Sequence, residues 1–376
     1  FYFTLYFSCF GSLSLHGSSL WDFTGARKDV KDTIYPYFRR AYCLPFFSLG
    51  RHWIRTRKCF LRIYYIDGRY PCVHLYESLK NILMKLTAHS EFGKIHSLMI
   101  KPVAAAFRNE SHLSAQWKAL NYLSQPDFKD SSNEYERFTE LIKSTQPVIY
   151  ELPWEKDIQI DSIYCRDASI STNEGMIICN MGKAGRANEP AHQKQIFEQF
   201  GIKILGKIKS PGTLEGGDVA WLNETTLAVG HTYRTNYEGI EQLRSLLKPL
   251  NVDVIVAEMP HYNGPNDVFH LMSVLSPIDK DLAVIYPRLM PIHFRNELLR
   301  RNFKLIDVPD REFDTMGCNV LALAPRKILM VHGNPMTQEL LQAAGVEVFT
   351  YAGIDISIKG GGGPTCLTRP IMRQAT

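Results

Sequence analysis

The sequence predicts an α/β fold built from five similar units, each contributing an amphipathic helix followed by a short strand. Two observations support this prediction. From about residue 93 onward, apolar residues recur at helical spacing and then give way to β-rich runs. A break separates each helix from its strand, and most breaks fall on Gly or Asn, which suit the left-handed residue of a helix C-cap. The break residues are Gln146, Gly201, Asn251, Asn302 and Gly345.

The predicted helices and strands alternate along the chain. The helices cover residues 135–143, 195–200, 240–250, 296–301 and 338–344. The strands that follow them cover residues 148–150, 202–205, 252–256, 303–306 and 346–349. Successive breaks are about 55, 50, 51 and 43 residues apart, and recurrence near 50 residues is typical of a repeat or propeller-like architecture around a central channel. An ordinary α/β domain with coincidental spacing is the alternative.

Length and composition limit the class of protein. The 376 residues allow one large domain or two to three ordinary ones, and 45% hydrophobic with 22% charged residues is typical of a globular protein. No apolar stretch reaches the roughly 18–20 residues of a membrane span. A net charge of +5 is too small to indicate nucleic-acid binding. We therefore expect no membrane and no nucleic-acid partner, and the oligomeric state stays open.

The first ninety residues differ in composition from the rest. They hold 13 basic and 5 acidic residues and 20 of the 43 aromatic residues, whereas the remainder holds 30 basic and 33 acidic residues. No helical or strand period runs through residues 1–75. The apolar residues 1–10 lack the basic start of a secretory signal, and the basic and aromatic run 51–58 only weakly indicates nucleic-acid binding. We predict that residues 1–92 are a poorly ordered or extraneous extension without chemistry, and that residues 93–376 form the functional domain.

The cysteine pattern favours a reducing compartment. The chain has eight cysteines, with no C-x-x-C pair and no zinc-like spacing. Neither a disulfide scaffold nor a metal site is indicated, and we expect a cytoplasmic location.

A glycine run near the end of the sequence precedes a candidate nucleophile. Residues 360–363 are all Gly, and Cys366 follows closely. Glycines let the backbone approach a ligand, and a cysteine in a chain without disulfides becomes a nucleophile once its pKa is lowered. The alternative is an inert buried cysteine, an interpretation that suits Cys179 and Cys318 better.

Two further segments carry groups suited to acid–base chemistry. His270 follows the turn-rich residues 261–266 and is predicted to lie in the strand 267–274, although a lone strand histidine is more often structural. Glu215 and Asp218 flank a Gly-Gly pair. Such a turn could be a hairpin or a cation site, but Glu215 could also orient an imidazole in a Cys/His/carboxylate set.

Asp167 is a candidate for binding a cation. It follows Arg166 and is predicted to lie at the end of a strand. A buried Asp requires a cationic partner, and a planar guanidinium is the best match for the two oxygens of a carboxylate. A structural pair with Arg166 is the competing interpretation.

These segments occur in the order seen in guanidino-group-modifying enzymes. They are Arg166-Asp167, the residues from Glu215 to Asp218, His270-Leu271 and the Gly-rich segment of Cys366. The chain therefore resembles the amidinotransferase/arginine deiminase superfamily over about residues 93–376, and most closely its dimethylarginine dimethylaminohydrolase-like branch. The resemblance implies a five-bladed pseudo-symmetric α/β propeller of ββαβ-type repeats, which agrees with the five units predicted from spacing.

The resemblance also implies roles for individual residues. The implied catalytic residues are Cys366 as nucleophile, His270 as general acid and base, and Glu215 as the carboxylate that positions His270. The implied substrate-binding residues are Asp167, which would hold the guanidinium, Arg186 and Arg234, which would hold an α-carboxylate, and Asp218. For both arginines, an ordinary position on the surface is the alternative.

One position departs from the superfamily pattern. Arginine deiminases and amidinotransferases usually have a second guanidinium-binding Asp two positions after the catalytic His, and this chain has Met272 there. The apolar side chain leaves one guanidinium nitrogen without an anionic partner. This favours a substituted guanidine, such as dimethylarginine, over free arginine.

The reaction that the resemblance implies is hydrolysis of a C–N bond through a covalent thiouronium on Cys366. The product would be a ureido compound such as citrulline, and no metal or organic cofactor is required. Transfer of the amidino group from arginine to an amine is an alternative with the same intermediate. A non-catalytic propeller that binds arginine-like ligands is another. A cysteine protease is less favoured, since carboxylates suit a small cation better than a peptide carbonyl.

Overall fold

The computed structural model describes residues 85–376 and, from the N-terminal part of the chain, only the residues of six short strands. The chain divides into two units, Phe1–Met84 and Lys85–Thr376. In the first unit the strands pair antiparallel as β1 with β2, β3 with β4 and β5 with β6; their bounds are Leu5–Phe7, Leu13–Leu15, Leu20–Trp21, Arg27–Lys28, Leu49–Thr56 and Cys59–Ile66. The rest of residues 1–84 lies outside the described residues, and so do the predictions made for the order, chemistry and nucleic-acid binding of this segment.

The second unit starts earlier than the predicted boundary at residue 92. Strand β7 (Leu86–Thr87) pairs antiparallel with β22 (Arg369–Gln374), so residues 85–92 belong to the same unit as residues 93–376. The ring of His89 stacks on Trp221 with centroids 3.9 Å apart. These contacts join residues far apart in the sequence, and local periodicity could not indicate them. None of the helices among the described residues is long and apolar enough to cross a membrane.

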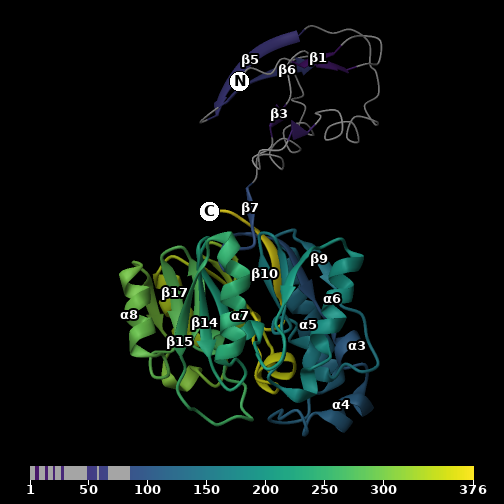
Figure 1. Cartoon of the computed structure of the whole chain (residues 1–376), viewed down its shortest axis with the longest axis vertical. Coiled ribbons are helices and arrows are strands. Elements are labelled where there is room, and N and C mark those ends of the chain that lie inside the picture. The colour runs from purple at the N-terminus through teal and green to yellow at the C-terminus, as the bar shows by residue number, and fades with distance from the viewer. Residues whose placement is uncertain are drawn as a thin grey trace. The chain divides into compact units, whose positions relative to one another are not determined.

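Residues 85–376 form the predicted five-bladed α/β propeller. Four blades have three strands each, and the remaining blade has four, in the order β7-β22-β8-β9. Figure 1 shows the small sheets with helices at the periphery. The strand bounds in that blade, beyond those already given, are Ile95–Ile100 for β8 and Val148–Glu151 for β9.

The other four blades share one topology. In each, two antiparallel strands form a hairpin, a helix follows, and a third strand pairs parallel to the second. The strands are β10–β12 (Ser169–Thr172, Gly175–Ile178, Ile204–Lys207), β13–β15 (Val219–Asn223, Thr226–His231, Asp253–Glu258), β16–β18 (Leu275–Asp279, Leu282–Ile285, Lys304–Asp307) and β19–β21 (Leu321–Ala324, Lys327–Val331, Glu347–Tyr351).

The helices and their ends agree with the predicted units. Each blade has one crossover helix: α5 (Phe128–Lys143), α6 (Glu189–Gln199), α7 (Tyr237–Leu247), α8 (Ile292–Arg300) and α9 (Pro335–Ala343), with α3 (Val103–Ala106) and α4 (Glu110–Gln116) before α5. All five predicted break residues have positive φ: Gln146 57°, Gly201 71°, Asn251 55°, Asn302 64° and Gly345 78°. Each helix therefore reverses through a left-handed residue into its strand, as predicted.

The first strand of each hairpin, together with β22, lies on the inner side of the propeller. Neighbouring inner strands are joined by hydrogen bonds: Trp221 Nε1 donates to a carbonyl of β10 (3.2 Å), and Ser171 Oγ donates to a carbonyl of β22 (2.5 Å). Ser276 Oγ donates to Cys318 O (2.7 Å), next to β19, and Arg373 Nη1 donates to a carbonyl of β19 (2.8 Å). These bonds fix the blades around the axis.

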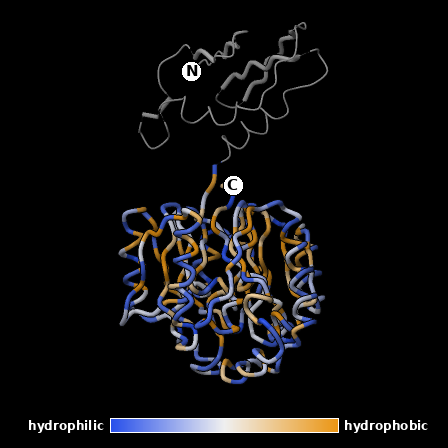
Figure 2. Tube along the Cα trace, turned by 90° about the vertical axis from the view of Figure 1, so that its right-hand side faces the viewer, coloured by the Kyte–Doolittle hydropathy of each residue, from blue (hydrophilic) through white to orange (hydrophobic). Residues whose placement is uncertain are grey.

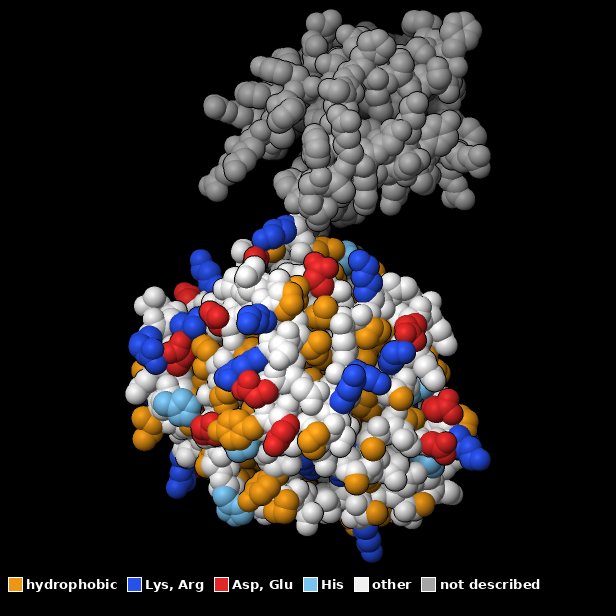
Figure 3. All heavy atoms as spheres, viewed as in Figure 1, with side chains coloured by type: hydrophobic (Ala, Val, Ile, Leu, Met, Phe, Trp, Pro, Cys, Tyr) orange, Lys and Arg blue, Asp and Glu red, His pale blue; other side chains and the backbone are white. Residues whose placement is uncertain are grey.

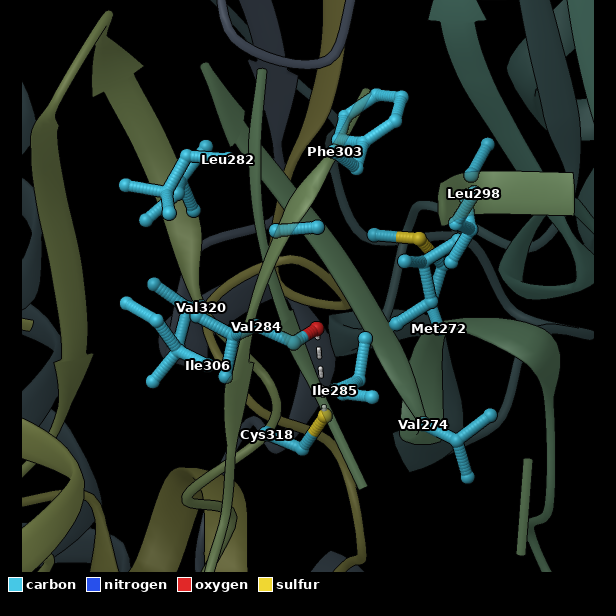
Figure 4. Packing of buried hydrophobic residues seen from close by; sticks show 14 of the residues in the cluster. Met272, Val274, Leu282, Val284, Ile285, Leu298, Phe303, Ile306, Cys318 and Val320 are labelled. Atoms are coloured by element: carbon cyan, nitrogen blue, oxygen red, sulfur yellow. Dashed lines mark hydrogen bonds between the residues drawn. The ribbon is translucent and has the colours of Figure 1, made fainter. Parts of the chain in front are cut away.

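Apolar side chains fill the space between blades. Figure 2 shows hydrophobic residues concentrated on the strands and hydrophilic ones on the outer helices and loops of residues 85–376. The largest cluster includes Met272, Leu298 and Cys318, and the Sγ of Cys318 lies 3.9 Å from Val284 O (Figure 4). Basic and acidic side chains are interspersed on the face seen in Figure 3. The rigid packing holds the loops at the ends of the inner strands in place.

Candidate active site

Each blade places one polar residue just before its inner strand. Asp167 precedes β10, Glu215 precedes β13, His270 precedes β16, Asn319 precedes β19 and Cys366 precedes β22. Because the inner strands surround one axis, residues separated by up to about two hundred positions converge there. The repeated topology thus explains how five distant segments build one site.

Two predicted local conformations are wrong. His270 does not lie in a strand: it caps the single-turn helix η6 (Leu271–Ser273), and its backbone N–H donates to Ser273 Oγ (3.1 Å). Asp167 lies in a turn that precedes β10 and does not end a strand. Single helical turns are too short for a hydrophobic period to reveal them.

One cavity brings Cys366, His270 and Asp167 together. Its lining residues are Asp161, Tyr164, Asp167, Lys183, Arg186, Arg234, Val268, His270, Gly360, Gly361, Gly362 and Cys366. Arg186 and Arg234 are both only 4% exposed, so the alternative of ordinary surface arginines is wrong for both.

Asp167 presents one unpaired oxygen. Its Oδ2 accepts a hydrogen bond from Arg186 Nη1 (2.5 Å), whereas its buried Oδ1 has no hydrogen-bond donor among the described residues. Arg186 also donates to both oxygens of Glu189 and to Tyr164 O. Burial lowers the pKa of Arg186, but Glu189 and Asp167 outweigh it and hold that pKa well above its usual value. Arg186 therefore stays charged and fixes the orientation of Asp167.

Glu215 and His270 form a buried pair. Glu215 is fully buried; its Oε1 accepts from the backbone N–H groups of Gly182 and Lys183 (3.0 Å each), and its Oε2 accepts from His270 Nε2 (2.8 Å). The other ring nitrogen, Nδ1, lies 4.0 Å from Asp167 Oδ1. His270 therefore turns Nδ1 toward Asp167, on the cavity side.

The surrounding carboxylates make His270 basic. Burial alone would lower its pKa, but Asp218, Asp167 and Glu215 outweigh burial and raise the pKa to about 9. For Glu215, burial favours the neutral form, but the hydrogen bond and positive charge of His270, with Arg234, hold its pKa below the usual value. The pair is therefore imidazolium and carboxylate at neutral pH.

The Cys366 thiol is buried and contacts an unpredicted residue. Asn319 Nδ2 lies 3.3 Å from Cys366 Sγ, and Asn319 Oδ1 accepts hydrogen bonds from Thr365 N and Oγ1. Burial and the charge of Asp167 raise the pKa of Cys366, whereas hydrogen bonds from Asn319 and Thr365 lower it. The net effect is a raised pKa, so the thiol needs a further positive charge nearby to ionise near neutral pH.

Glycines allow the site residues to approach one another. A Cβ on Gly217 would lie 2.5 Å from His270 Nδ1 and 2.7 Å from Asp167 Oδ1, distances that real Cβ atoms do not show. In the glycine run, a Cβ on Gly362 would lie 2.5 Å from the ring of Tyr164. The run thus makes room for Tyr164 as well as for a ligand.

Asp218 does not line the cavity. Its Oδ2 accepts from Thr232 Oγ1 and Thr235 Oγ1 (2.7 Å each), and its Oδ1 accepts from Leu271 N (3.0 Å). Burial raises the pKa of Asp218 to about 6. The hydrogen bond from Leu271 N fixes Asp218 next to His270. Asp218, which the resemblance implied as a substrate-binding residue, thus contacts Leu271 N next to His270 and is not among the residues that line the cavity.

Three charged or amide residues of the site were not predicted, namely Asp161, Lys183 and Asn319. Lys183 Nζ donates to Asp161 Oδ2 (2.6 Å), and both side chains line the cavity. No motif marks them, because Asp161 lies in an isolated helical turn. Asn319 could have been found from the repeat, since it holds the position that the other four site residues occupy in their blades.

The propeller, with cysteine, histidine and carboxylates around one cavity, is the arrangement expected of a guanidino-group-modifying enzyme. The sequence model of the arginine deiminase family matches residues 160–300 and 292–373, and the chain belongs to this family. The predicted superfamily is thereby confirmed. An uncharacterised protein from Aeropyrum pernix is 28% identical over 246 residues, covering 65% of this chain and 85% of that protein. The arginine deiminase of Mycoplasma capricolum is 26% identical over 294 residues, covering 66% and 72%.

Solved structures show the same fold. DDAH from Pseudomonas aeruginosa, a cysteine-to-serine variant complexed with citrulline, superposes with a TM-score of 0.58 and 20% identity, covering 73% of this chain and 98% of that chain. The N-terminal domain of ArgZ, an arginine dihydrolase from the cyanobacterial ornithine–ammonia cycle, bound to its product, gives a TM-score of 0.63 and 17% identity, covering 74% and 97%.

Proposed function

We propose that the protein hydrolyses a C–N bond of a guanidino compound and releases a ureido product and an amine. The unpaired Oδ1 of Asp167 carries this proposal. A buried carboxylate oxygen without a donor requires one, and it lines the same cavity as Cys366 and His270. A guanidinium supplies both the charge and the N–H groups that this oxygen lacks.

Binding of the substrate activates the nucleophile. Burial and the charge of Asp167 keep the free thiol of Cys366 protonated near neutral pH. A guanidinium held by Asp167 brings a positive charge beside Sγ, and a nearby opposite charge favours the thiolate. The thiol proton then leaves to solvent as the substrate binds. The nucleophile thus forms only in the presence of its target.

His270 serves as acid first and as base later. The thiolate attacks the guanidinium carbon, and His270, whose pKa of about 9 keeps it protonated, gives its Nδ1 proton to the leaving amine as the C–N bond breaks. The neutral imidazole then takes a proton from water, whose oxygen attacks the thiouronium carbon. The C–S bond breaks, leaving the ureido product and Cys366. Glu215 keeps the Nε2 proton in place throughout.

Arg234 is the best candidate for binding an α-carboxylate. Its Nη1 lies 3.6 Å from Glu215 Oε1, and Nη2 donates to Asp267 O at 3.3 Å, so both contacts are long. Arg186 would be the second partner, although all its nitrogens already donate within the site. We therefore propose an amino acid with a guanidino side chain as substrate.

An N-substituted guanidine such as dimethylarginine is the preferred substrate in this proposal. Met272, at the position where related enzymes have a second Asp, is 2% exposed and packs in the apolar core. It offers no carboxylate to a second guanidinium nitrogen, so a methylated nitrogen loses nothing there. The four cysteines of residues 85–376 are free thiols, which supports a cytoplasmic location.

A product assay tests the proposal. The full chain is incubated separately with dimethylarginine, arginine, monomethylarginine, agmatine and guanidinoacetate, and both the ureido product and the released amine are measured. We expect citrulline and dimethylamine from dimethylarginine, a slower reaction with arginine, and no ureido product from Cys366→Ser. Ornithine formed from arginine and glycine without citrulline would show amidino transfer instead, and undiminished turnover by Cys366→Ser would refute the mechanism.

A further inference from the structure

Three arginine side chains are buried together on the inner side of the propeller. Arg166, Arg369 and Arg373 are 1%, 4% and 1% exposed. Arg166 precedes β10 and donates from Nη2 to Val219 O on β13 (3.3 Å). Arg373 lies on β22 and reaches β19. Arg166, which precedes β10, and Arg373, which lies on β22, thus donate to carbonyls of the inner strands β13 and β19.

These guanidinium groups have more donors than acceptors. Arg369 Nη2 donates to Arg166 O (2.5 Å), and Arg373 Nη1 donates to Gly93 O (2.7 Å). Among the described residues, five of their nitrogens have no hydrogen-bond partner: Arg166 Nε and Nη1, Arg369 Nε, and Arg373 Nε and Nη2. Buried N–H groups are almost always paired in folded proteins. Here the unpaired ones belong to three arginines that lie near enough for the charge of Arg166 to act on both Arg369 and Arg373.

The charge of the cluster is also incomplete. Glu91 is the one carboxylate that pairs with it within the described residues, through Arg166 Nη2 at 2.8 Å. Burial, with a smaller contribution from the positive charge of Arg166, lowers the pKa of Arg369 and of Arg373 to about 10, and Glu91 opposes this shift. With a pKa of about 10, Arg369 and Arg373 stay protonated at neutral pH. Together with the guanidinium of Arg166, they set three positive charges against one negative charge.

We propose that the arginine cluster Arg166–Arg369–Arg373 binds a small monovalent inorganic anion, of the size of chloride, in the channel of the propeller. An anion accepts several N–H donors at once and offsets the uncompensated positive charge, whereas water would satisfy donors but not charge. A small ion fits the near-complete burial of all three side chains. This inference does not depend on the proposed reaction.

Such an anion would lie directly behind the catalytic loops. Arg166 is the neighbour of Asp167, and its backbone N–H donates to Cys366 O (3.2 Å). Arg369 holds the carbonyl of Arg166 and follows Cys366 by three positions. The anion would thus hold together the segments that carry the nucleophile and the guanidinium-binding carboxylate.

Thermal unfolding of the full chain tests the proposal. Chloride is titrated against gluconate at constant ionic strength, since a ligand that binds only the folded state raises the unfolding temperature along a saturation curve. We expect such a curve for the parent protein. In Arg373→Gln, the midpoint should move to at least about tenfold higher chloride, because charge-assisted donors are lost. The control Arg137→Gln, an exposed arginine on α5 paired with Glu140, should follow the parent.

A second measurement decides the matter even if Arg373→Gln does not fold. Crystals of the parent protein are soaked in bromide, and the anomalous signal is mapped. A bromide peak among the three guanidinium groups supports the proposal. The proposal is overturned if bromide is ordered elsewhere in the crystal but not among these guanidinium groups. It is also overturned if sulfate and phosphate produce a saturation curve in thermal unfolding and chloride does not.

Discussion

Glu215 Oε2 accepts a hydrogen bond of 2.8 Å from His270 Nε2, and this bond sets which ring nitrogen faces the cavity. The two backbone donors on Glu215 Oε1 hold the carboxylate still. A buried acid with every acceptor in use can orient an imidazole without becoming protonated itself. The relationship leads to the first prediction.

Glu215→Gln should lower kcat by roughly 10²- to 10⁴-fold, as expected when a histidine loses its orienting carboxylate. His270 must be protonated to act as acid, so kcat of the parent should fall as pH rises through about 9. The amide removes one of the charges that raise this pKa, so the alkaline limb should move to lower pH. The pH dependence of kcat measures both effects. Glu198→Gln, an exposed residue paired with Lys194, is the control, and an unmoved alkaline limb in Glu215→Gln would contradict the assignment.

Gly217→Ala should reduce kcat/KM by about 10²-fold or more with a much smaller loss of stability. The added Cβ would lie 2.5 Å from His270 Nδ1 and 2.7 Å from Asp167 Oδ1, and displacements of about 1 Å cost this much in catalysis. Gly201→Asn is the matched control, because Gly201 has a φ of 71° and open space around it. Steady-state kinetics and thermal unfolding are compared. If Gly217→Ala lost no more activity than Gly201→Asn, the site would tolerate the added Cβ and the prediction would be wrong.

Asn319→Leu should raise the pKa of the Cys366 thiol further. The leucine keeps the approximate volume but removes the N–H that lies 3.3 Å from Sγ and lowers this pKa. The rate of alkylation by iodoacetamide as a function of pH reports the thiolate, and its midpoint should move to higher pH. Cys366→Ser identifies the part of the signal that belongs to Cys366. A midpoint that stays in place would mean that Asn319 only packs against the loop.

Two truncations test where the folded unit begins. Removal of residues 1–84 should leave turnover unchanged, since we predict no chemistry there. Removal of residues 1–92 also deletes Glu91, which pairs with Arg166 at 2.8 Å, and should cost about 3–5 kcal/mol of stability because it leaves a buried charge without its partner. Turnover and chemical denaturation of both truncations provide the comparison. Equal stability of the two would place the boundary near residue 92, as the composition suggested.

The outer part of each blade could be predicted from the sequence, whereas the inner part could not. Helices such as α5 and α7 have an apolar face, and each is followed within a few residues by a residue with positive φ, Gln146 and Asn251. Those signals are local. The hairpins next to the axis consist of short buried strands, and a run of four apolar residues shows no period that separates strand from helix.

The site was predictable in its members more than in its geometry. The order of motifs indicated Cys366, His270 and Asp167, and the structure brings these three to one cavity. The order of motifs did not indicate that Asp218 accepts a hydrogen bond from Leu271 N, next to His270. Hydrogen bonds of this kind depend on two loops from different blades, and no spacing within one segment reports them.

The position of β22 has a consequence for the timing of folding. This strand inserts between β7 and β8 in the blade that begins residues 85–376, although it follows every other strand of the propeller along the chain. During synthesis, the ring can therefore close only after all other blades have left the ribosome. Cys366 precedes β22 by three positions and follows Asp167, Glu215, His270 and Asn319 along the chain. A nascent chain therefore lacks its candidate nucleophile, and cannot be active, until the other four blades have been synthesised.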